Sequence, residues 1–284
     1  MATPRTGFAR TDDGHEFPYL DAGGEKRLLA RLPTPQDHKI RTLIPTWDQG
    51  VSAGTLPPVQ FKDIKPFKHI RDDVPILDQD GKGACLPHAW TSATMISRAI
   101  SGAAFTKLSP WFLYSLINGG WDAGSNAGDA LQALTETGIC PDSDVPYATI
   151  RPKGYNAAAM KAASRFKLRT AYKIEGFEQA VIAASLGYAI TFDLHAGMGF
   201  DVDSDGICAY LRLGGNNHEV MAGEEYVTIN GKPYIGGRNS WGEQWGVKGR
   251  CYWQPNHLDH SEETYAVAFT TDDPSDSNMP PVIA

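Results

Sequence analysis

A glycine-rich loop that leads directly into a helical segment is the feature that most constrains this chain. The loop runs from Asp78 to Cys85, and the predicted helix begins at Pro87. Proline suits the first turn of a helix because its missing N–H would be unpaired there. Cys85 is therefore expected at a helix N-terminus, where free amides and the positive end of the dipole stabilise an anion. Such a thiol ionises easily, so Cys85 is a candidate nucleophile as well as a candidate packing residue.

A glutamine and a histidine flank this cysteine. Gln79 lies six residues before Cys85, and the glycines between them allow its neutral amide to fold back over the sulfur. Together with the Cys85 backbone N–H, that amide is a candidate donor to an oxyanion. His88 lies three residues after Cys85. We expect it to make a polar contact where the lobes meet rather than to act as a second base.

A predicted β-hairpin in the second half carries a histidine and an asparagine at its base. The hairpin turns at Asn230-Gly231, a pair typical of tight two-residue turns. His218 precedes its first strand, and Asn239 follows its return strand 21 residues later. The Asn239 amide oxygen can then hold one ring nitrogen of His218 while the other nitrogen faces Cys85. Trp241 is expected to shield that hydrogen bond from water.

The order of predicted elements divides the chain into a helical half and a β half. Residues 57–170 carry most of the predicted helices, and residues 171–270 carry most of the predicted strands. We therefore expect an α+β fold, with a helical lobe and an antiparallel β lobe in one domain over 57–270 and an active site in the cleft between them. Residues 1–56 are predicted to be an irregular N-terminal extension with a short helix near 25–32, and residues 271–284 a C-terminal tail. Such extensions also suggest self-assembly or a place in a larger complex.

Composition excludes several classes of protein. The chain has 284 residues and a formal net charge of −7, which argues against a nucleic-acid-binding surface. No apolar run is long enough to span a bilayer, and the first residues lack the apolar core of a signal peptide. The four cysteines show neither a metal-ligand spacing nor a dense disulfide framework, although a single bridge stays open. We expect a reducing setting without membrane contact, either the cytoplasm or the interior of a reducing assembly.

The residues singled out above resemble those of the papain-like cysteine peptidases in kind, order and spacing. The resemblance covers about residues 57–270. It includes the Gln79–Cys85 spacing, the Asn217-His218 pair with His218 133 residues after Cys85, and the block from Asn239 to Gly242. It implies that Cys85 is the nucleophile, His218 the base and Asn239 its orienting partner. Gln79 and the Cys85 N–H would form the oxyanion hole.

The same resemblance implies substrate-binding positions. These lie in a glycine-asparagine loop and immediately before the histidine, at Asn126, Ala127, Gly128 and Asn217. No metal or other cofactor is implied, and the expected partner is a peptide or protein substrate.

The chain also departs from the family pattern. Leu86-Pro87 follows the nucleophile where members usually have Trp-Ala, and Glu219 follows the histidine where a small residue is common. Lys82 and Ser125 stand where many members have two bridged cysteines, which fits a reducing compartment. No helical inhibitory propeptide is recognisable in residues 1–56. Glu219 is expected to add negative charge near the imidazolium.

Two further features of the sequence are interpreted as structural rather than functional. Asp201, Asp203, Asp205 and Gly206 imitate the start of a calcium-binding EF-hand loop, but Arg212 stands where the loop needs a bidentate glutamate. An acidic surface turn is the favoured interpretation. The other three cysteines are expected to be structural: Cys140, Cys208 and Cys251.

Three functional hypotheses follow. The first is a cysteine peptidase that hydrolyses peptide bonds through a Cys-His-Asn triad and a covalent thioester acyl-enzyme. The second is a catalytically weak or inert papain-like protein with a structural or interaction role in an assembly, suggested by Leu86-Pro87 and Glu219. The third is an amidase or transamidase that uses the same triad.

Overall fold

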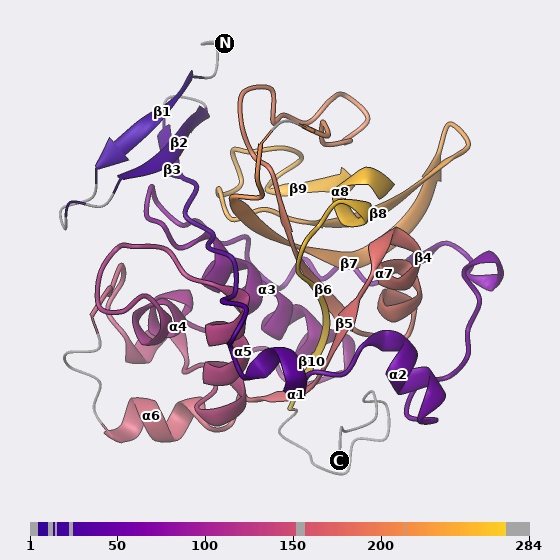
Figure 1. Cartoon of the computed structure of the whole chain (residues 1–284), viewed down its shortest axis with the longest axis horizontal. Coiled ribbons are helices and arrows are strands. Elements are labelled where there is room, and N and C mark those ends of the chain that lie inside the picture. Colours follow the sequence, from indigo (N-terminus) through magenta and orange to yellow (C-terminus); the bar gives the residue numbers. More distant parts are fainter. Residues whose placement is uncertain are drawn as a thin grey trace.

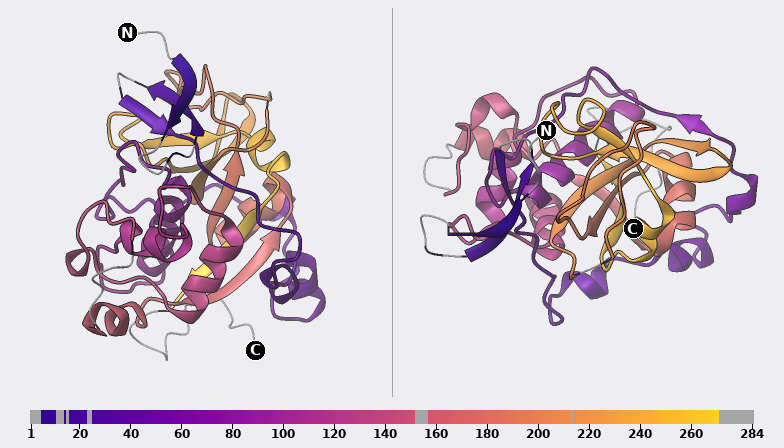
Figure 2. Two further views of the ribbon diagram at one scale, coloured as in Figure 1. Left: turned by 60° about the vertical axis from the view of Figure 1, so that its left-hand side comes forward. Right: turned by 90° about the horizontal axis from the view of Figure 1, so that it is seen from above.

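The computed structural model describes residues 5–10, 14, 16–22, 25–151, 157–212 and 214–270. Its body consists of a helical part and a β part that meet along α3 (Cys85–Ile100), as Figures 1 and 2 show. The α+β architecture predicted from the sequence is present. The predicted C-terminal tail, 271–284, lies outside the described residues.

The helical part is built around α3, which packs against α4 (Pro110–Ile117) on one side and the β-sheet on the other. Only Ile100 among the sixteen residues of α3 is not buried. The helix begins at Cys85, two residues before the predicted start, so Pro87 falls in the first turn, where a missing N–H is harmless. The lobe also contains α5 (Ala127–Glu136) and α6 (Ala157–Ala163).

Side-chain caps fix where two of these helices begin. Ser109 accepts a hydrogen bond from the Phe112 N–H at the start of α4, and Pro110 follows it. Asn126 accepts one from the Asp129 N–H at the start of α5. The loop before α5 also contacts the segment before α3, since Asp122 Oδ1 accepts a hydrogen bond from the Gly83 N–H at 2.9 Å.

An antiparallel sheet forms the β part. Its strands lie in the order β5 (Leu168–Ile174), β10 (Thr264–Phe269), β6 (Ala189–Leu194), β7 (His218–Ile229), β8 (Lys232–Arg238) and β9 (Arg250–Trp253). A short strand, β4 (Phe67–Lys68), also pairs with β7. Two helices, α7 (Gly176–Ser185) and α8 (Pro255–Asp259), pack on this part.

The β7–β8 pair confirms the predicted hairpin. Its turn places Asn230 and Gly231 at φ values of 51° and 76°, the left-handed conformation that this dipeptide tolerates. Met221 pairs with Arg238 across the hairpin. This register brings the residue after β8 beside the first residue of β7.

The described residues of the N-terminal extension form regular strands and helices, where the sequence predicts an irregular segment. A three-stranded sheet forms from β1 (Arg5–Arg10), β2 (Glu16–Ala22) and β3 (Glu25–Leu28), and two short helices follow, α1 (Ile40–Leu43) and α2 (Trp47–Ser52). The predicted helix at 25–32 is wrong. Its first half pairs with β2 and its second half lies extended, because backbone partners in β2 and in the body outweigh its helical propensity.

The segment between β3 and α1 crosses the molecule between its two parts. In Figure 1 this indigo chain descends from the N-terminal sheet past α3 to α1. We call residues 28–34 the strap. No described helix is long and apolar enough to cross a membrane.

Candidate active site

Cys85 occupies the first position of α3 and is completely buried. Burial raises the pKa of its thiol to about 11, although backbone N–H groups of Glu219, Ala30 and Leu86 favour the thiolate. The expected acidic thiol is therefore not present in this state. The helix N-terminus does not compensate for removing the sulfur from water. At neutral pH, Cys85 is a protonated thiol here.

His218 and Asn239 lie side by side at the base of the β7–β8 hairpin. The Nε2 atom of His218 is 2.7 Å from Oδ1 of Asn239, and that oxygen also accepts a hydrogen bond from the Ser240 N–H at 2.8 Å. Because this amide oxygen accepts hydrogen bonds and cannot donate one, Nε2 must be the protonated ring nitrogen of His218. The Trp241 ring covers this pair, with its centroid 5.0 Å from that of His218.

The other ring nitrogen of His218 is available for chemistry. Nδ1 is buried and has no hydrogen-bond partner among the described residues. Burial lowers the pKa of His218 to about 4, so the ring is neutral and Nδ1 carries a free lone pair. An unprotonated nitrogen held in a fixed orientation is suited to accept a proton.

Gln79 is buried with its amide fixed by four contacts. Its Oε1 accepts hydrogen bonds from Ser240 Oγ at 2.9 Å and Trp241 Nε1 at 3.2 Å. Its Nε2 donates to the carbonyls of Lys82 at 2.7 Å and Leu28 at 3.0 Å. The two donors on Oε1 direct the NH₂ group toward the strap, so that one of its hydrogens is held by a strap carbonyl.

The strap pairs with both parts of the molecule. Arg31 N–H donates to the Asn217 carbonyl at 3.2 Å, and Leu32 N–H donates to the Ser125 carbonyl at 2.9 Å. Ser125 N–H donates in turn to the Ala30 carbonyl at 3.3 Å. The chain's own backbone therefore occupies the space beside Cys85. Hydrogen bonding by the Ala30 backbone lowers the pKa of Cys85, which indicates that this part of the strap lies near the sulfur.

The predicted substrate-binding residues hold this strap or its surroundings. The Asn217 carbonyl binds it directly, and Gly128 N–H donates to Thr34 Oγ1 at 3.0 Å. Asn126 caps α5, and Ala127 is buried at the start of that helix. Their role toward a substrate stays a prediction.

Sequence reasoning missed the strap. One signal was available in the two glycines that flank Ala30. A Cβ at Gly124 would lie 2.0 Å from the Ala30 carbonyl oxygen, and one at Gly83 would lie 2.8 Å from the Ala30 Cβ. Both positions thus leave room for a chain that passes between them.

Glu219 has a different environment from the one expected. Its Oε1 accepts a hydrogen bond from Trp90 Nε1 at 3.2 Å, and its Oε2 lies 3.7 Å from Arg31 Nε. Burial holds the pKa of Glu219 well above its usual range, despite the opposing effect of Arg31. Burial therefore disfavours the negative charge that the sequence predicted beside His218.

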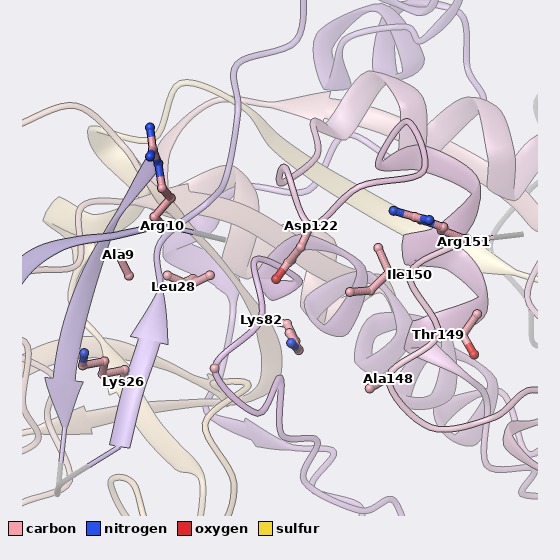
Figure 3. A pocket seen from close by; sticks show the side chains of 11 residues that line it. Ala9, Arg10, Lys26, Leu28, Lys82, Asp122, Ala148, Thr149, Ile150 and Arg151 are labelled. Carbon is pink, nitrogen blue, oxygen red and sulfur yellow. The ribbon is translucent and has the colours of Figure 1, made fainter. Parts of the chain in front are cut away.

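A separate cavity of about 550 Å³ is lined in part by Leu28 of the strap and by Gly81 and Lys82 of the loop before Cys85. Figure 3 shows it between the N-terminal sheet, which contributes Ala9, Arg10 and Lys26, and the loop that carries Ala148–Arg151. Neither Cys85 nor His218 lines it. The chemistry predicted from the sequence is therefore enclosed, not open to this cavity.

The remaining predicted features are structural in this state. His88 Nδ1 lies 2.7 Å from the Ala84 carbonyl and its ring packs on Trp111, a polar contact inside the helical part. In the acidic turn, Asp203 Oδ1 accepts N–H bonds from Asp205 and Ile207, and no metal-binding cluster occurs among the described residues. The four cysteines are free and buried.

The chain is similar to known cysteine proteases. A family model described as papain family cysteine protease matches residues 70–268. Cathepsin O of Mus musculus is 28% identical over 190 residues, a match that covers 65% of this chain and 60% of cathepsin O. The chain thus spans less than two thirds of that relative.

Two solved structures share the fold. Xylellain, a cysteine protease from Xylella fastidiosa, has a TM-score of 0.61 at 17% identity, over 84% of this chain and 95% of xylellain. Digestive procathepsin L2 from the larval midgut of Tenebrio molitor has a TM-score of 0.63 at 18% identity, over 82% of this chain and 76% of that one. The resemblance and the papain-like α+β fold predicted from the sequence are confirmed.

Proposed function

Because this chain belongs to the papain family of cysteine proteases, we propose that it is a cysteine peptidase that the strap holds in a closed, latent state. Cys85, His218 and Asn239 carry the reaction, and residues 28–34 must leave before a substrate can enter. The observation that supports this most is the fixed His218–Asn239 contact with an unprotonated, unpartnered Nδ1. Peptides and proteins are the proposed substrates.

Displacement of the strap changes the protonation of the site. Water that enters removes the burial that now raises the pKa of Cys85 and lowers that of His218. The thiol proton can then pass to Nδ1, which leaves a thiolate beside an imidazolium. Asn239 retains the Nε2 proton and keeps the ring in the orientation that this transfer needs.

The reaction proceeds through an acyl-enzyme. The thiolate attacks the peptide carbonyl carbon, and the oxyanion accepts hydrogen bonds from Gln79 Nε2 and the Cys85 N–H, which as the first helical amide has no partner within α3. The Nδ1 proton passes to the leaving amine as the C–N bond breaks. His218 then takes a proton from water, whose oxygen displaces the Cys85 sulfur and releases the acid.

The strap occupies a hydrogen-bond donor that the reaction needs. The Leu28 carbonyl accepts a hydrogen bond from Gln79 Nε2 at 3.0 Å. Gln79 can therefore donate this hydrogen to an oxyanion only after the strap has left.

A Cys85→Ala comparison tests the proposal. An Arg31→Ala protein, in which the strap is weakened, should cleave a mixed peptide library, and the Arg31→Ala/Cys85→Ala protein should not. Equal cleavage by the two proteins would exclude Cys85 as the nucleophile. A fully buried site also suits an inert protein, and the absence of cleavage and of Cys85 labelling in the Arg31→Ala protein would favour that reading.

A further inference from the structure

Three buried carboxylates of the body surround one arginine of the strap. Arg31 contacts Asp193 at 2.8 Å and Glu263 through the same terminal nitrogen, and its Nε lies 3.7 Å from Glu219. The exposed fraction of these four side chains is at most 4%. We call Asp193, Glu219 and Glu263 the acidic pocket. It is large enough to enclose a guanidinium group.

The body of the molecule supplies all three carboxylates, although Thr34 of the strap also donates hydrogen bonds to Glu263 Oε2, from its N–H at 3.2 Å and its Oγ1 at 3.0 Å. Asp193 on β6 pairs in register with Glu219 on β7. Asp193 Oδ1 accepts hydrogen bonds from Ser261 Oγ and from the N–H groups of Glu262 and Glu263, at 2.8 and 3.1 Å for the two amides. These three hydrogen bonds fix the orientation of the Asp193 carboxylate, and its other oxygen, Oδ2, faces Arg31. The hydrogen bonds that hold Asp193 and Glu219 come from the body and do not depend on the strap.

The pocket lies beside the reacting atoms. Glu219 directly follows His218 on β7, and Arg31 N–H donates to the carbonyl of Asn217, the residue before His218, at 3.2 Å. The backbones of Glu219 and of Ala30, the residue before Arg31, both lower the pKa of Cys85, which indicates that they lie near the thiol. A peptide bound in place of the strap therefore has a side chain at this pocket within one or two residues of the bond that Cys85 attacks.

Removal of Arg31 leaves the pocket with excess negative charge. Two of the buried carboxylates would lose a direct ion-pair partner, and Arg41, which reaches only Glu263 at 3.2 Å, is partly exposed. Buried like charges of this kind are costly unless a cation joins them. Several oxygens arranged about one point suit the planar fork of a guanidinium better than the single ammonium of lysine.

We propose that, once the strap is displaced, the acidic pocket binds a basic side chain of the substrate, arginine in preference to lysine, next to the scissile bond. This inference rests on the proposed peptidase function. Arg31 is then a stand-in for the substrate's arginine. The pocket selects the substrate class, and the same carboxylates hold the enzyme closed.

Paired peptides that differ only in charge test this directly. Full-length Arg31→Ala protein is assayed with fluorogenic peptides that carry arginine or its neutral isostere citrulline at each position near the cleavable bond. The arginine peptide should be preferred by about 30-fold or more in kcat/KM at one position, the lower range for a buried charge pair. Binding of the same two peptides to the Arg31→Ala/Cys85→Ala protein is measured by fluorescence anisotropy.

Substitutions in the pocket supply the controls. In the Arg31→Ala background, Asp193→Asn should abolish the preference for arginine, and Glu263→Gln serves as a second variant if the first does not fold. Glu262→Gln makes the same charge change at the exposed neighbouring residue and should keep the preference.

Peptide binding tests the pocket assignment, and peptide hydrolysis tests the proposed peptidase function. If the arginine and citrulline peptides bind equally well, or if neither peptide binds, the pocket assignment is overturned whatever the hydrolysis result. Selective binding of the arginine peptide without hydrolysis of any peptide supports the pocket and overturns the proposed peptidase function.

Discussion

Replacement of Arg31 by alanine should open the site. The side chain is buried against Asp193, Glu219 and Glu263, and its loss leaves the two carboxylates that it contacts directly without that partner in the closed state. Breaking a buried ion pair costs about 3–5 kcal/mol. We take the lower figure because water can enter the space left by the arginine. A cost of about 3 kcal/mol raises the open-to-closed ratio about a hundredfold.

Alkylation of Cys85 reports the open fraction. The sulfur is completely buried in the closed state, so a small reagent such as iodoacetamide reacts only with molecules in which the strap has moved. The second-order rate, followed by intact-protein mass spectrometry in native buffer, should rise about a hundredfold in Arg31→Ala, as the ratio above requires.

A matched variant and a clear outcome make the test decisive. Arg10→Ala removes an exposed arginine of the same N-terminal segment, whose ion pair with Glu16 is 3.8 Å long, and should leave the rate unchanged. An unchanged rate in a folded Arg31→Ala protein would refute the claim that the buried ion pairs hold the strap.

Three other perturbations follow from the same geometry. Gly124→Ala should speed Cys85 alkylation because its Cβ would lie 2.0 Å from the Ala30 carbonyl; Gly119→Ala, at a similar positive φ with nothing within 4 Å, controls for backbone strain, and equal rates in both would contradict the clash. Gln79→Ala in the Arg31→Ala background should lower kcat by about 100-fold or more with little change in KM, as loss of an oxyanion donor does, and a change in KM alone would assign Gln79 to binding. Burial lowers the pKa of His88, His218 and His257 to about 4, so the unfolded chain binds more protons and the free energy of unfolding should fall as pH drops from about 6.5 to about 4. For His88 alone the loss is up to about 3 kcal/mol, so His88→Gln should flatten the pH dependence of denaturant unfolding, and an identical slope would exclude this cause.

The sequence was sufficient to predict those parts of the structure that depend on residues close together in the chain. The Asn230-Gly231 turn has one favoured geometry, and the hairpin it forms brings His218 and Asn239 together. The spacing of apolar residues predicted the helix after Cys85 to within two residues of its start. These features depend on neighbours in sequence or on one short register.

The strap could not be predicted because its structure depends on partners far along the chain. Residues 25–32 favour a helix locally, yet they pair with β2 and with Ser125 and Asn217. Arg31 meets acids from three separate strands and loops, at 193, 219 and 263. The pKa of Cys85 was mispredicted for the same reason, since its burial is partly the work of this distant segment. The expected reducing compartment and self-assembly stay predictions.

The acyl-enzyme itself gives the most direct test of the central claim that Cys85 and His218 form a latent peptidase site. Arg31→Ala protein is mixed with an arginine-containing peptide ester, quenched in acid during turnover and analysed by mass spectrometry. We predict an acyl group on the peptide that contains Cys85, and none in the Arg31→Ala/His218→Ala protein. Turnover without an adduct on Cys85, or an adduct that forms equally well without His218, would contradict it.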